Sequence, residues 1–350
     1  MSTNANASDQ QPKSTQQQEI ENNIDNWLEK HDVPAVAIAY IEKGNLQWSG
    51  VFGEQSPGVN ATSDTLFNIA SMTKSISAET ILRLASSGKI NLDEQMSVHW
   101  IDPDIARDPR HQLLTPKIAL RHRAGFPNWR PKNGDGLAFQ FTPGEQASYS
   151  GEGYDYVARF AEKKLDRSFT ALAHQEIFQP LDMDQVSYVG EKWFSGRVAQ
   201  PQGPDGKRRT ADVRDKWSAA DDVHITIRDY TKFLISVMKN EGLSKYLADQ
   251  RFKLSDNIFA KGCPWGPDSC PLKGGFAMGW AVFEYQGETV IMQGGGDWGE
   301  RTLGFFVPER EIGIAVFTNG ANGSAIIKKV VEILHPGSDY IAFLAFQARQ

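Results

Sequence analysis

A serine followed three positions later by a lysine can form a nucleophile and its proton acceptor. Residues at this spacing share one face of a helix, so the amine can reach the hydroxyl. A lysine accepts a proton only when neutral, and its ordinary pKa of about 10.4 falls when burial or nearby positive charge disfavours the ammonium. The chain contains this spacing three times, in Ser71–Lys74, Ser86–Lys89 and Ser236–Lys239. The spacing by itself does not distinguish these pairs.

The surroundings of Ser71 distinguish it from the other two serines. An apolar stretch at 65–70 leads directly into it, and residues 71–87 are expected to form a helix that Gly88 ends. Free N–H groups and the positive end of the helix dipole at such an N-terminus favour a developing anion. The other two serines lie near a helix end and within an amphipathic helix, where solvated polar residues are common. The same pattern also fits a serine N-cap followed by an exposed Lys74.

Apolar periodicity predicts the elements that position these residues. We expect helices at 19–31, 71–87, 154–165, 169–178, 225–240 and 330–334, and strands at 35–40, 46–52, 277–284, 289–293, 303–307 and 312–318. Strands near both ends that enclose a helical middle predict one α/β domain interrupted by a helical one. A crevice between two such bodies is a common place for a ligand.

The domain boundaries follow from this pattern and from composition. We expect residues 19–88 and 223–350 to form the α/β domain and residues 89–222 a mainly helical domain. The first 18 residues are polar and cannot bury enough apolar surface to offset their ordering entropy, so they are expected to be a disordered tail.

Charge and motif content exclude several functions. The 350 residues carry a formal net charge of −6, which disfavours nucleic acid and anionic lipid as partners. No apolar run approaches the ~20 residues of a membrane span. We find no metal-ligand spacing, no phosphate-binding glycine loop and no Gly-x-Ser-x-Gly sequence, so no metal or cofactor is expected. The expected partner is a small-molecule substrate, and the sequence leaves the oligomeric state open.

The segment Phe67–Lys74, FNIASMTK, resembles the nucleophile motif of the β-lactamase and penicillin-binding protein superfamily, in its class C-like branch. That branch also includes esterases related to class C β-lactamases and D-amino-acid peptidases. Further segments resemble this family in the same order along the chain: 88–94, 120–127, 143–145, 149–154, 177–183, 279–280, 304–308 and 317–319. The resemblance implies an α/β fold with a central antiparallel sheet, flanking helices and an inserted, mainly helical domain.

The resemblance also implies catalytic roles. Ser71 would be acylated, Lys74 would accept its proton, and Tyr149 would share that proton and pass it to the leaving group. The backbone amides of Ser71 and Gly296 would form the oxyanion hole, in which one donor contributes about 2.7–4 kcal/mol. Without the resemblance, Tyr149 would be interpreted as a core residue.

Two substrate-binding positions depart from the β-lactamase pattern. Gly151 stands where the Tyr-x-Asn motif has its asparagine, and neutral Gln293 replaces the cation of the third motif. Gln293, Gly294 and Gly295 would line the cleft, where glycines let a substrate approach the backbone; a glycine-rich hairpin turn is the alternative. A hydrogen bond to a charged group contributes about 1.5–3 kcal/mol, so losing the cation would weaken carboxylate anchoring about 10- to 150-fold.

Residues near these motifs have less defined roles. Arg301, or an arginine within 121–130, is a candidate replacement cation, and His122 is expected to be structural. Three tryptophans lie in segments that could border the cleft: Trp129, Trp217 and Trp298. The alternative for each is packing in the core or on the surface.

Cys263 and Cys270 are seven residues apart, which fits a small disulfide-closed loop or two free thiols. A bridge would favour an oxidising compartment. The first 18 residues contain no signal-peptide core, so either the protein is cytoplasmic or a leader has been removed. The resemblance and the possible bridge together favour export to the periplasm.

Three functions fit these observations. The first is a hydrolase that forms an acyl-enzyme on an ester or a small amide or peptide. The second is a true β-lactamase or D-Ala-D-Ala carboxypeptidase, and the third is a catalytically weak ligand-binding domain of the same fold. The joint presence of Ser71, Lys74 and Tyr149 argues against the third, while Gly151 and Gln293 argue against the second.

Overall fold

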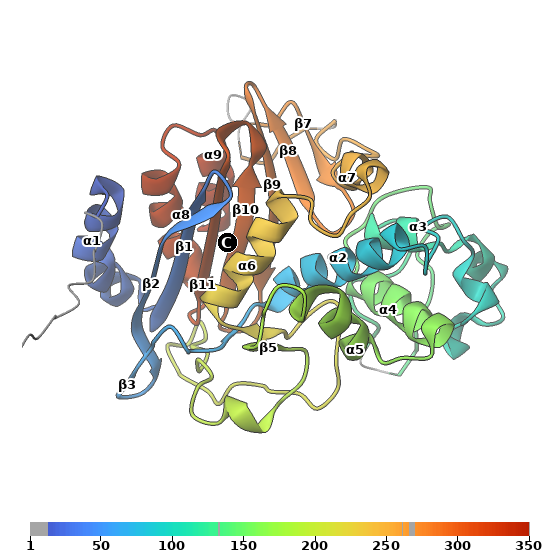
Figure 1. The fold of residues 1–350 in the computed structure, drawn as a ribbon, viewed down its shortest axis with the longest axis horizontal. Coiled ribbons are helices and arrows are strands. Elements are labelled where there is room, and N and C mark those ends of the chain that lie inside the picture. The colour runs from blue at the N-terminus through green and yellow to red at the C-terminus, as the bar shows by residue number, and fades with distance from the viewer. Residues whose placement is uncertain (1–12, 132–133, 261, 266–269, 350) are drawn as a thin grey trace, which may run out of the picture.

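The computed structural model describes residues 13–131, 134–260, 262–265 and 270–349. An eight-stranded antiparallel sheet lies at its centre, in the order β3–β2–β1–β11–β10–β9–β8–β7 (Figure 1). Its strands are β1 (Ala35–Glu42), β2 (Asn45–Ser56), β3 (Val59–Asn60), β7 (Lys273–Phe276), β8 (Ala281–Tyr285), β9 (Glu288–Gly296), β10 (Arg301–Val307) and β11 (Ile312–Thr318).

Helices cover both faces of the sheet, so the predicted α/β architecture is confirmed. The helices are α1 (Thr15–His31), α2 (Thr73–Ser86), α3 (Pro116–Leu120), α4 (Gly151–Leu165), α5 (Phe169–Ala173), α6 (Ile227–Met238), α7 (Lys245–Arg251), α8 (Gly323–Leu334) and α9 (Tyr340–Gln347). In Figure 1, α2 to α5 lie to one side of the sheet, and the segments between them are short 3₁₀ turns and loops.

Alternation along the strands divides the core into two layers, because successive side chains point to opposite faces. On β1, Ala35, Ala37 and Ala39 belong to the core that contains α2 and α6. Val36 and Ile38 belong to the core formed with α1, α8 and α9. The sheet is therefore buried on both faces.

A small second sheet fixes the segment that leads to Ser71. Its strands are β4 (Phe67–Asn68), β5 (Val186–Ser187) and β6 (His224–Ile225), in the order β4–β6–β5. Phe67 pairs with Ile225, and Asn68 pairs with His224. Because β5 also pairs with β6, the small sheet joins three segments that are distant in the sequence, directly before the predicted nucleophile.

Several predicted bounds differ from the observed ones, and two of these differences have a clear physical cause. Helix α1 begins at Thr15 rather than at 19, because Ser14 Oγ accepts a hydrogen bond from the Gln17 N–H and caps it; residues 1–12 of the predicted tail lie outside the described residues. The single strand predicted at 277–284 is divided into β7 and β8. Gly279 lies between them with φ +88°, and a Cβ there would lie 2.3 Å from Ala78 Cβ, so the chain turns closely against α2.

Cys263 and Cys270 form a disulfide bond, with their Cα atoms 6.0 Å apart. The sequence alone had not decided between this bond and two free thiols. Beside the bridge, the Trp265 ring contacts Phe283 of β8 and both Phe343 and Phe346 of α9. The loop therefore packs onto α9, an additional helix that the sequence analysis did not predict.

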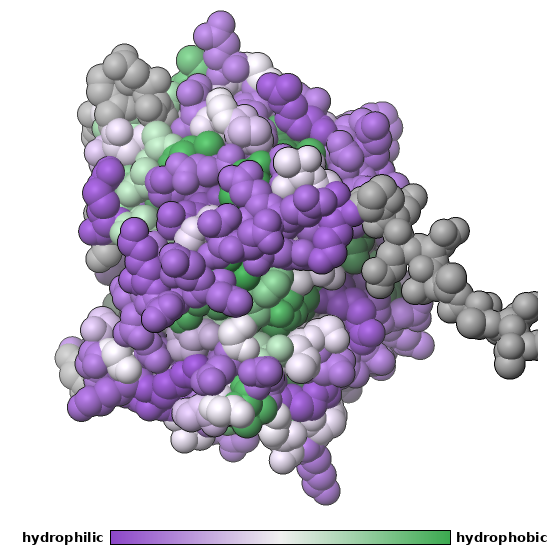
Figure 2. Space-filling model, turned by 90° about the vertical axis from the view of Figure 1, so that its left-hand side faces the viewer, coloured by the Kyte–Doolittle hydropathy of each residue, from purple (hydrophilic) through white to green (hydrophobic). Residues whose placement is uncertain are grey.

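The side of the molecule that carries α1 and β2 is mostly hydrophilic, with only small apolar areas (Figure 2). Within the described ranges, no helix combines the length and apolar character needed to cross a membrane.

Candidate active site

Ser71 lies in the 3₁₀ turn Ala70–Met72, which connects β4 to α2. Ala70 has φ +45°, an uncommon conformation for a residue other than glycine. Two hydrogen bonds hold the turn: the Ala70 N–H donates to Asn68 Oδ1 over 2.8 Å, and Thr302 Oγ1 donates to the Ile69 carbonyl over 2.9 Å. Such a conformation costs on the order of 1–3 kcal/mol and persists because its neighbours impose it.

Lys74 lies on the first turn of α2 and is fully buried. Its Nζ is 3.0 Å from Ser71 Oγ and 2.8 Å from the Ala220 carbonyl oxygen. The same Nζ lies 4.7 Å from the centre of the Tyr149 ring and 5.5 Å from that of Trp129. The amine is therefore surrounded by two acceptors and two aromatic rings.

Tyr149 precedes α4, and its position is set by His122. The two rings stack with their centres 4.5 Å apart. The Ser148 N–H donates to the His122 carbonyl over 2.8 Å, and the Ser150 N–H donates to His122 Nδ1 over 3.0 Å. Burial lowers the pKa of His122 to about 3, so the ring is neutral and can accept at Nδ1. His122 thus holds the backbone on both sides of Tyr149.

Gln293 joins the nucleophile segment to Tyr149. Its Nε2 lies 3.2 Å from the Ser71 carbonyl oxygen, 3.4 Å from Tyr149 Oη and 3.1 Å from the Gly294 carbonyl oxygen. A Cβ at Gly295 would lie only 2.3 Å from the Ile69 carbonyl oxygen, so only glycine lets β9 approach this turn.

The end of β9 leaves one edge open beside Ser71. Strand β8 pairs with β9 as far as Met292, whereas β10 pairs with β9 through to Gly296. Among the described residues, β8 therefore provides no strand partner for residues 293–296. An extended substrate segment can form hydrogen bonds with such an edge.

A cavity of about 640 Å³ lies beside Ser71, Tyr149 and Gln293. Its polar wall includes Ser71, Asn128, Tyr149, Gln293 and Arg301, together with the glycines 294–296. Apolar side chains from β8 to β10, α8, α9 and the disulfide loop form the rest of the lining. The cavity thus combines a few polar groups near Ser71 with a larger apolar extension.

The candidate replacement cations differ in position. Arg301 lines the cavity, where its guanidinium donates to the carbonyls of Asp297 and Glu300, and burial lowers its pKa. Arg123 is paired with Asp256, and Arg130 with Glu152. Among the described residues, no arginine from 121–130 lines this cavity.

A group of carboxylates lies next to the segment that binds Lys74. Single oxygens of Asp221, Asp222 and Asp297 all lie within 4.8 Å of one another. Burial raises the pKa of Asp221 and of Asp222, and at Asp221 repulsion from its neighbour adds to this effect. Arg214 is ion-paired with Asp222. The spacing is short enough for a cation, but carboxylates alone do not define a metal site. No sequence motif links these residues, because Asp297 is distant in the sequence from Asp221 and Asp222.

The structure brings together the predicted site residues: Ser71, Lys74, Tyr149, Gly151, Gln293, Gly294, Gly295 and Gly296. Trp129 lies above the Lys74 amine, but Trp217 packs on Phe169 and Trp298 on Arg209. The sequence analysis missed Asn128 and Ala220. Neither belongs to a recognisable motif, and Ala220 acts through its backbone carbonyl.

Comparison with known proteins identifies the family. The family model described as Beta-lactamase matches residues 20–331, so the chain belongs to that family. Among curated proteins, protein flp of Staphylococcus aureus (strain N315) is 26% identical over 192 residues, 49% of this chain and 38% of that protein. The match thus spans less than two fifths of the length of that relative.

Two solved structures share the fold at low sequence identity. The octameric penicillin-binding protein homologue from Pyrococcus abyssi superposes with a TM-score of 0.77 at 20% identity, covering 92% of this chain and 78% of the other. The D-alanine carboxypeptidase AmpC from Burkholderia cenocepacia gives a TM-score of 0.74 at 18% identity, covering 91% and 98%. Family membership supports a serine hydrolase as the general class, and the two solved structures support the fold.

Proposed function

We propose that the protein is a serine hydrolase that forms an acyl-enzyme at Ser71 and acts on an ester or a small amide or peptide. The observation that carries this proposal is the 3.0 Å contact between Ser71 Oγ and a fully buried Lys74 Nζ. Tyr149 stands beside the same amine, and all three border or adjoin one cavity. A nucleophile and base at this distance meet the geometric requirement for covalent catalysis.

The reaction has two steps. Ser71 Oγ attacks the substrate carbonyl carbon while its proton passes to Lys74 Nζ, and Tyr149 Oη relays a proton to the departing alcohol or amine. Water then attacks the acyl-enzyme, the same groups remove its proton, and Ser71 Oγ recovers a proton as the acid leaves. The amides of Ser71 and Gly296 are proposed to bind the oxyanion in both steps.

Charge around the site favours substrates without a carboxylate at the anchoring position. Gln293 is neutral, and Asp221 and Asp222 lie next to Ala220, whose carbonyl binds Lys74.

A second candidate function is D-alanine carboxypeptidase or β-lactamase activity. This function is supported by the likeness to the Burkholderia carboxypeptidase fold and by Arg301, the one arginine among the described residues that line the cavity. A catalytically weak binding domain is the third candidate, and the assembled Ser71–Lys74 pair argues against it.

A substrate panel with two serine variants tests the proposal. The protein, Ser71→Ala and Ser86→Ala are incubated with p-nitrophenyl esters, nitrocefin and a fluorophosphonate. Ser86 has the same Ser-x-x-Lys spacing, but its Oγ accepts from the Ser244 N–H away from the cavity, so it is the matched control. We expect ester turnover and labelling in the protein and in Ser86→Ala, and neither in Ser71→Ala. Nitrocefin turnover that exceeds ester turnover would favour β-lactamase activity, the second candidate function. The absence of any Ser71-dependent reaction would exclude catalysis through Ser71.

A further inference from the structure

The cavity beside Ser71 continues past the open end of β9 to the opposite face of the sheet. Gln293 points toward Ser71, and its Nε2 lies 3.2 Å from the Ser71 carbonyl oxygen. Met292 and Leu303 point the other way, into the core formed with α1, α8 and α9. All four residues line the same cavity. Because β8 begins at Ala281, which pairs with Met292, the cavity passes around the end of that strand.

The part of the cavity on that far face, here called the apolar extension, has mostly apolar walls. Phe283 of β8, Ile327 of α8 and Phe343 of α9 contribute to them. Among the described residues that line the whole cavity, Arg301 is the only one with a charged side chain. Apolar walls favour the removal of an apolar group from water and offer no partner to a charged one. The apolar extension therefore suits an uncharged, apolar ligand group.

Aromatic rings fix both ends of this space. Near the site, the Phe276 ring packs on the Tyr149 ring with their centres 5.8 Å apart. At the far end, the Trp265 ring lies 5.2 Å from the Phe343 ring and 6.1 Å from the Phe346 ring. The disulfide bond described above closes the loop that carries Trp265. Because these contacts already hold the walls, little further ordering is needed when a ligand binds.

We propose that the apolar extension binds a long apolar chain of the substrate, so that the substrates are uncharged esters of a fatty acid or of a fatty alcohol. This inference rests on the proposed function, because the cavity begins at Ser71 and a chain within it must belong to the ester that Ser71 attacks. The chain can lie on either side of the ester bond, and burial of its methylenes against the same walls supplies the recognition in both cases.

Two isomeric esters test the proposal and distinguish the two sides. Hexyl acetate carries the long chain in its alcohol, whereas ethyl hexanoate carries it in its acid, and ethyl acetate is the short reference. Acid release at constant pH gives kcat/KM for each, below its solubility limit. One buried methylene is equivalent to about 4-fold in kcat/KM, so the four additional methylenes should give at least about a 10-fold gain for one isomer over ethyl acetate. The isomer that shows the gain identifies the side on which the chain lies.

Two variants locate the origin of that gain. Ala281 packs on the far side of β9 and is only partly buried, so Ala281→Phe places a ring in the apolar extension. Phe343→Ala removes part of the wall without adding bulk. We expect each to lower the ratio of kcat/KM for the favoured isomer over ethyl acetate by about 4-fold or more. Ala106→Phe is the matched control, because Ala106 is exposed and does not line the cavity, and it should keep the ratio of the parent protein.

Each alternative result is distinct. Equal kcat/KM for the three esters, or a gain that persists in both variants, overturns the inference while Ser71-dependent turnover still supports the hydrolase. An equal loss on all three esters in both variants also overturns it, because the substitutions then act on the reacting groups and not on the chain. If the protein turns over none of the esters and Ser71 is not labelled by the fluorophosphonate, the proposed function fails and the inference fails with it.

Discussion

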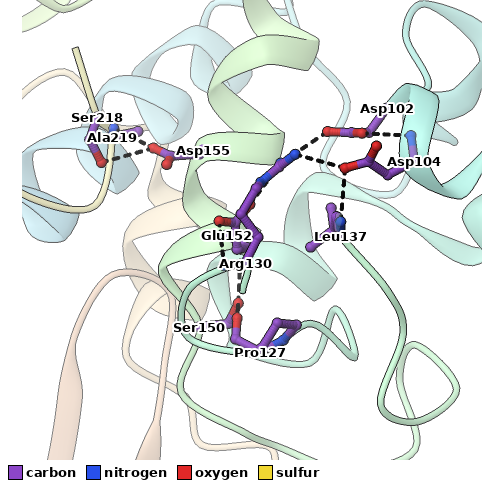
Figure 3. A network of polar contacts seen from close by, with 11 residues as sticks. Asp102, Asp104, Pro127, Arg130, Leu137, Ser150, Glu152, Asp155, Ser218 and Ala219 are labelled. Carbon is purple, nitrogen blue, oxygen red and sulfur yellow. Dashed lines mark hydrogen bonds and ion pairs between the residues drawn. The ribbon is translucent and has the colours of Figure 1, made fainter. Parts of the chain in front are cut away.

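Asp155 accepts a 2.7 Å hydrogen bond from the backbone N–H of Ala219, directly before the carbonyl to which Lys74 donates (Figure 3). Ser218 Oγ donates to the same carboxylate oxygen over 3.0 Å. Asp155 lies within α4, so this helix fixes the backbone that holds the proposed base. Asp155 therefore acts as a positioning residue for Lys74.

Replacing Asp155 is expected to lower kcat with little change in KM. Asp155→Ala removes two hydrogen bonds to a charged acceptor, each of about 1.5–3 kcal/mol, and only part of that loss reaches the Lys74 amine. We expect kcat to fall about 10-fold, with partial recovery in Asp155→Asn, which retains one acceptor oxygen. Steady-state kinetics on a p-nitrophenyl ester measures both constants. A rise in KM at unchanged kcat would instead place the effect in substrate binding.

The buried carboxyls of Asp155 and Glu300 are expected to contribute a fall in stability as the pH rises from about 4 to 7. Burial raises the pKa of Asp155 to about 6 and that of Glu300 to about 7, well above the values of the unfolded chain. The native state therefore retains protons that the unfolded state has released, which gives stability a negative slope against pH. One unit of pKa shift corresponds to about 1.4 kcal/mol.

Urea unfolding at about pH 5 and about pH 7.5 checks this slope. We expect the two carboxyls to lower the unfolding free energy at the higher pH by a few kcal/mol, whereas His122, whose pKa is lowered by burial, acts in the opposite direction below about pH 6.5. Glu300→Gln removes one titrating group, whose carboxylate accepts from the Gly299 N–H, and the slope of stability against pH should become less negative than in the parent protein. An identical slope in the variant would contradict the assignment.

His122 is expected to support Tyr149 without titrating in the working range. His122→Ala removes the stacked ring and the Nδ1 acceptor, and should cost about 2–4 kcal/mol of stability as well as kcat. His122 has φ +56°, a conformation that asparagine tolerates, and an asparagine Oδ1 can accept from the Ser150 N–H. His122→Asn should therefore lose less than His122→Ala.

Thermal unfolding and pH–rate profiles of both variants measure these effects. Because the pKa of His122 is about 3, the profile between about pH 5 and 8 should keep the same shape in His122→Asn. A missing limb of the profile would show that the histidine takes part in proton transfer.

The sequence predicted those parts of the site that are local in the chain. Ser71 and Lys74 share one helical turn, and strand alternation together with the family motifs placed β9 and the sheet around them. These features depend on periodicity and on short-range spacing, which a single sequence displays. The strands 289–293, 303–307 and 312–318 were predicted within a few residues of their observed bounds.

The remaining features depend on tertiary contacts and could not be predicted. Ala70 adopts a positive φ because distant residues impose it, and alanine gives no signal for that conformation. Asn128 is one asparagine in an irregular segment, and its relation to Gly151 exists only once Arg130 has docked on α4. The contact between Ala220 and Lys74 spans 146 residues and uses a backbone carbonyl that any residue type supplies.

Two glycines of α4 are expected to respond in opposite ways to a single added methyl group. At Gly153 a Cβ would meet Ala124 Cβ at an ordinary 3.6 Å, so Gly153→Ala should stabilise the protein by about 0.4–1 kcal/mol through the unfolded chain. At Gly151 the Cβ would lie 2.6 Å from the Trp129 ring, so Gly151→Ala should destabilise by about 1–3 kcal/mol.

A double-mutant cycle with Trp129→Ala isolates the cause of that difference. If the indole fills the space beside Gly151, the penalty of Gly151→Ala should fall by about 1–3 kcal/mol in the Trp129→Ala background, and only the close contact with the Asn128 carbonyl oxygen should remain. Gly153→Ala should show no coupling to Trp129, because its Cβ would contact other atoms. Equal destabilisation by Gly151→Ala in both backgrounds would mean that the backbone at 151, and not the tryptophan, requires glycine.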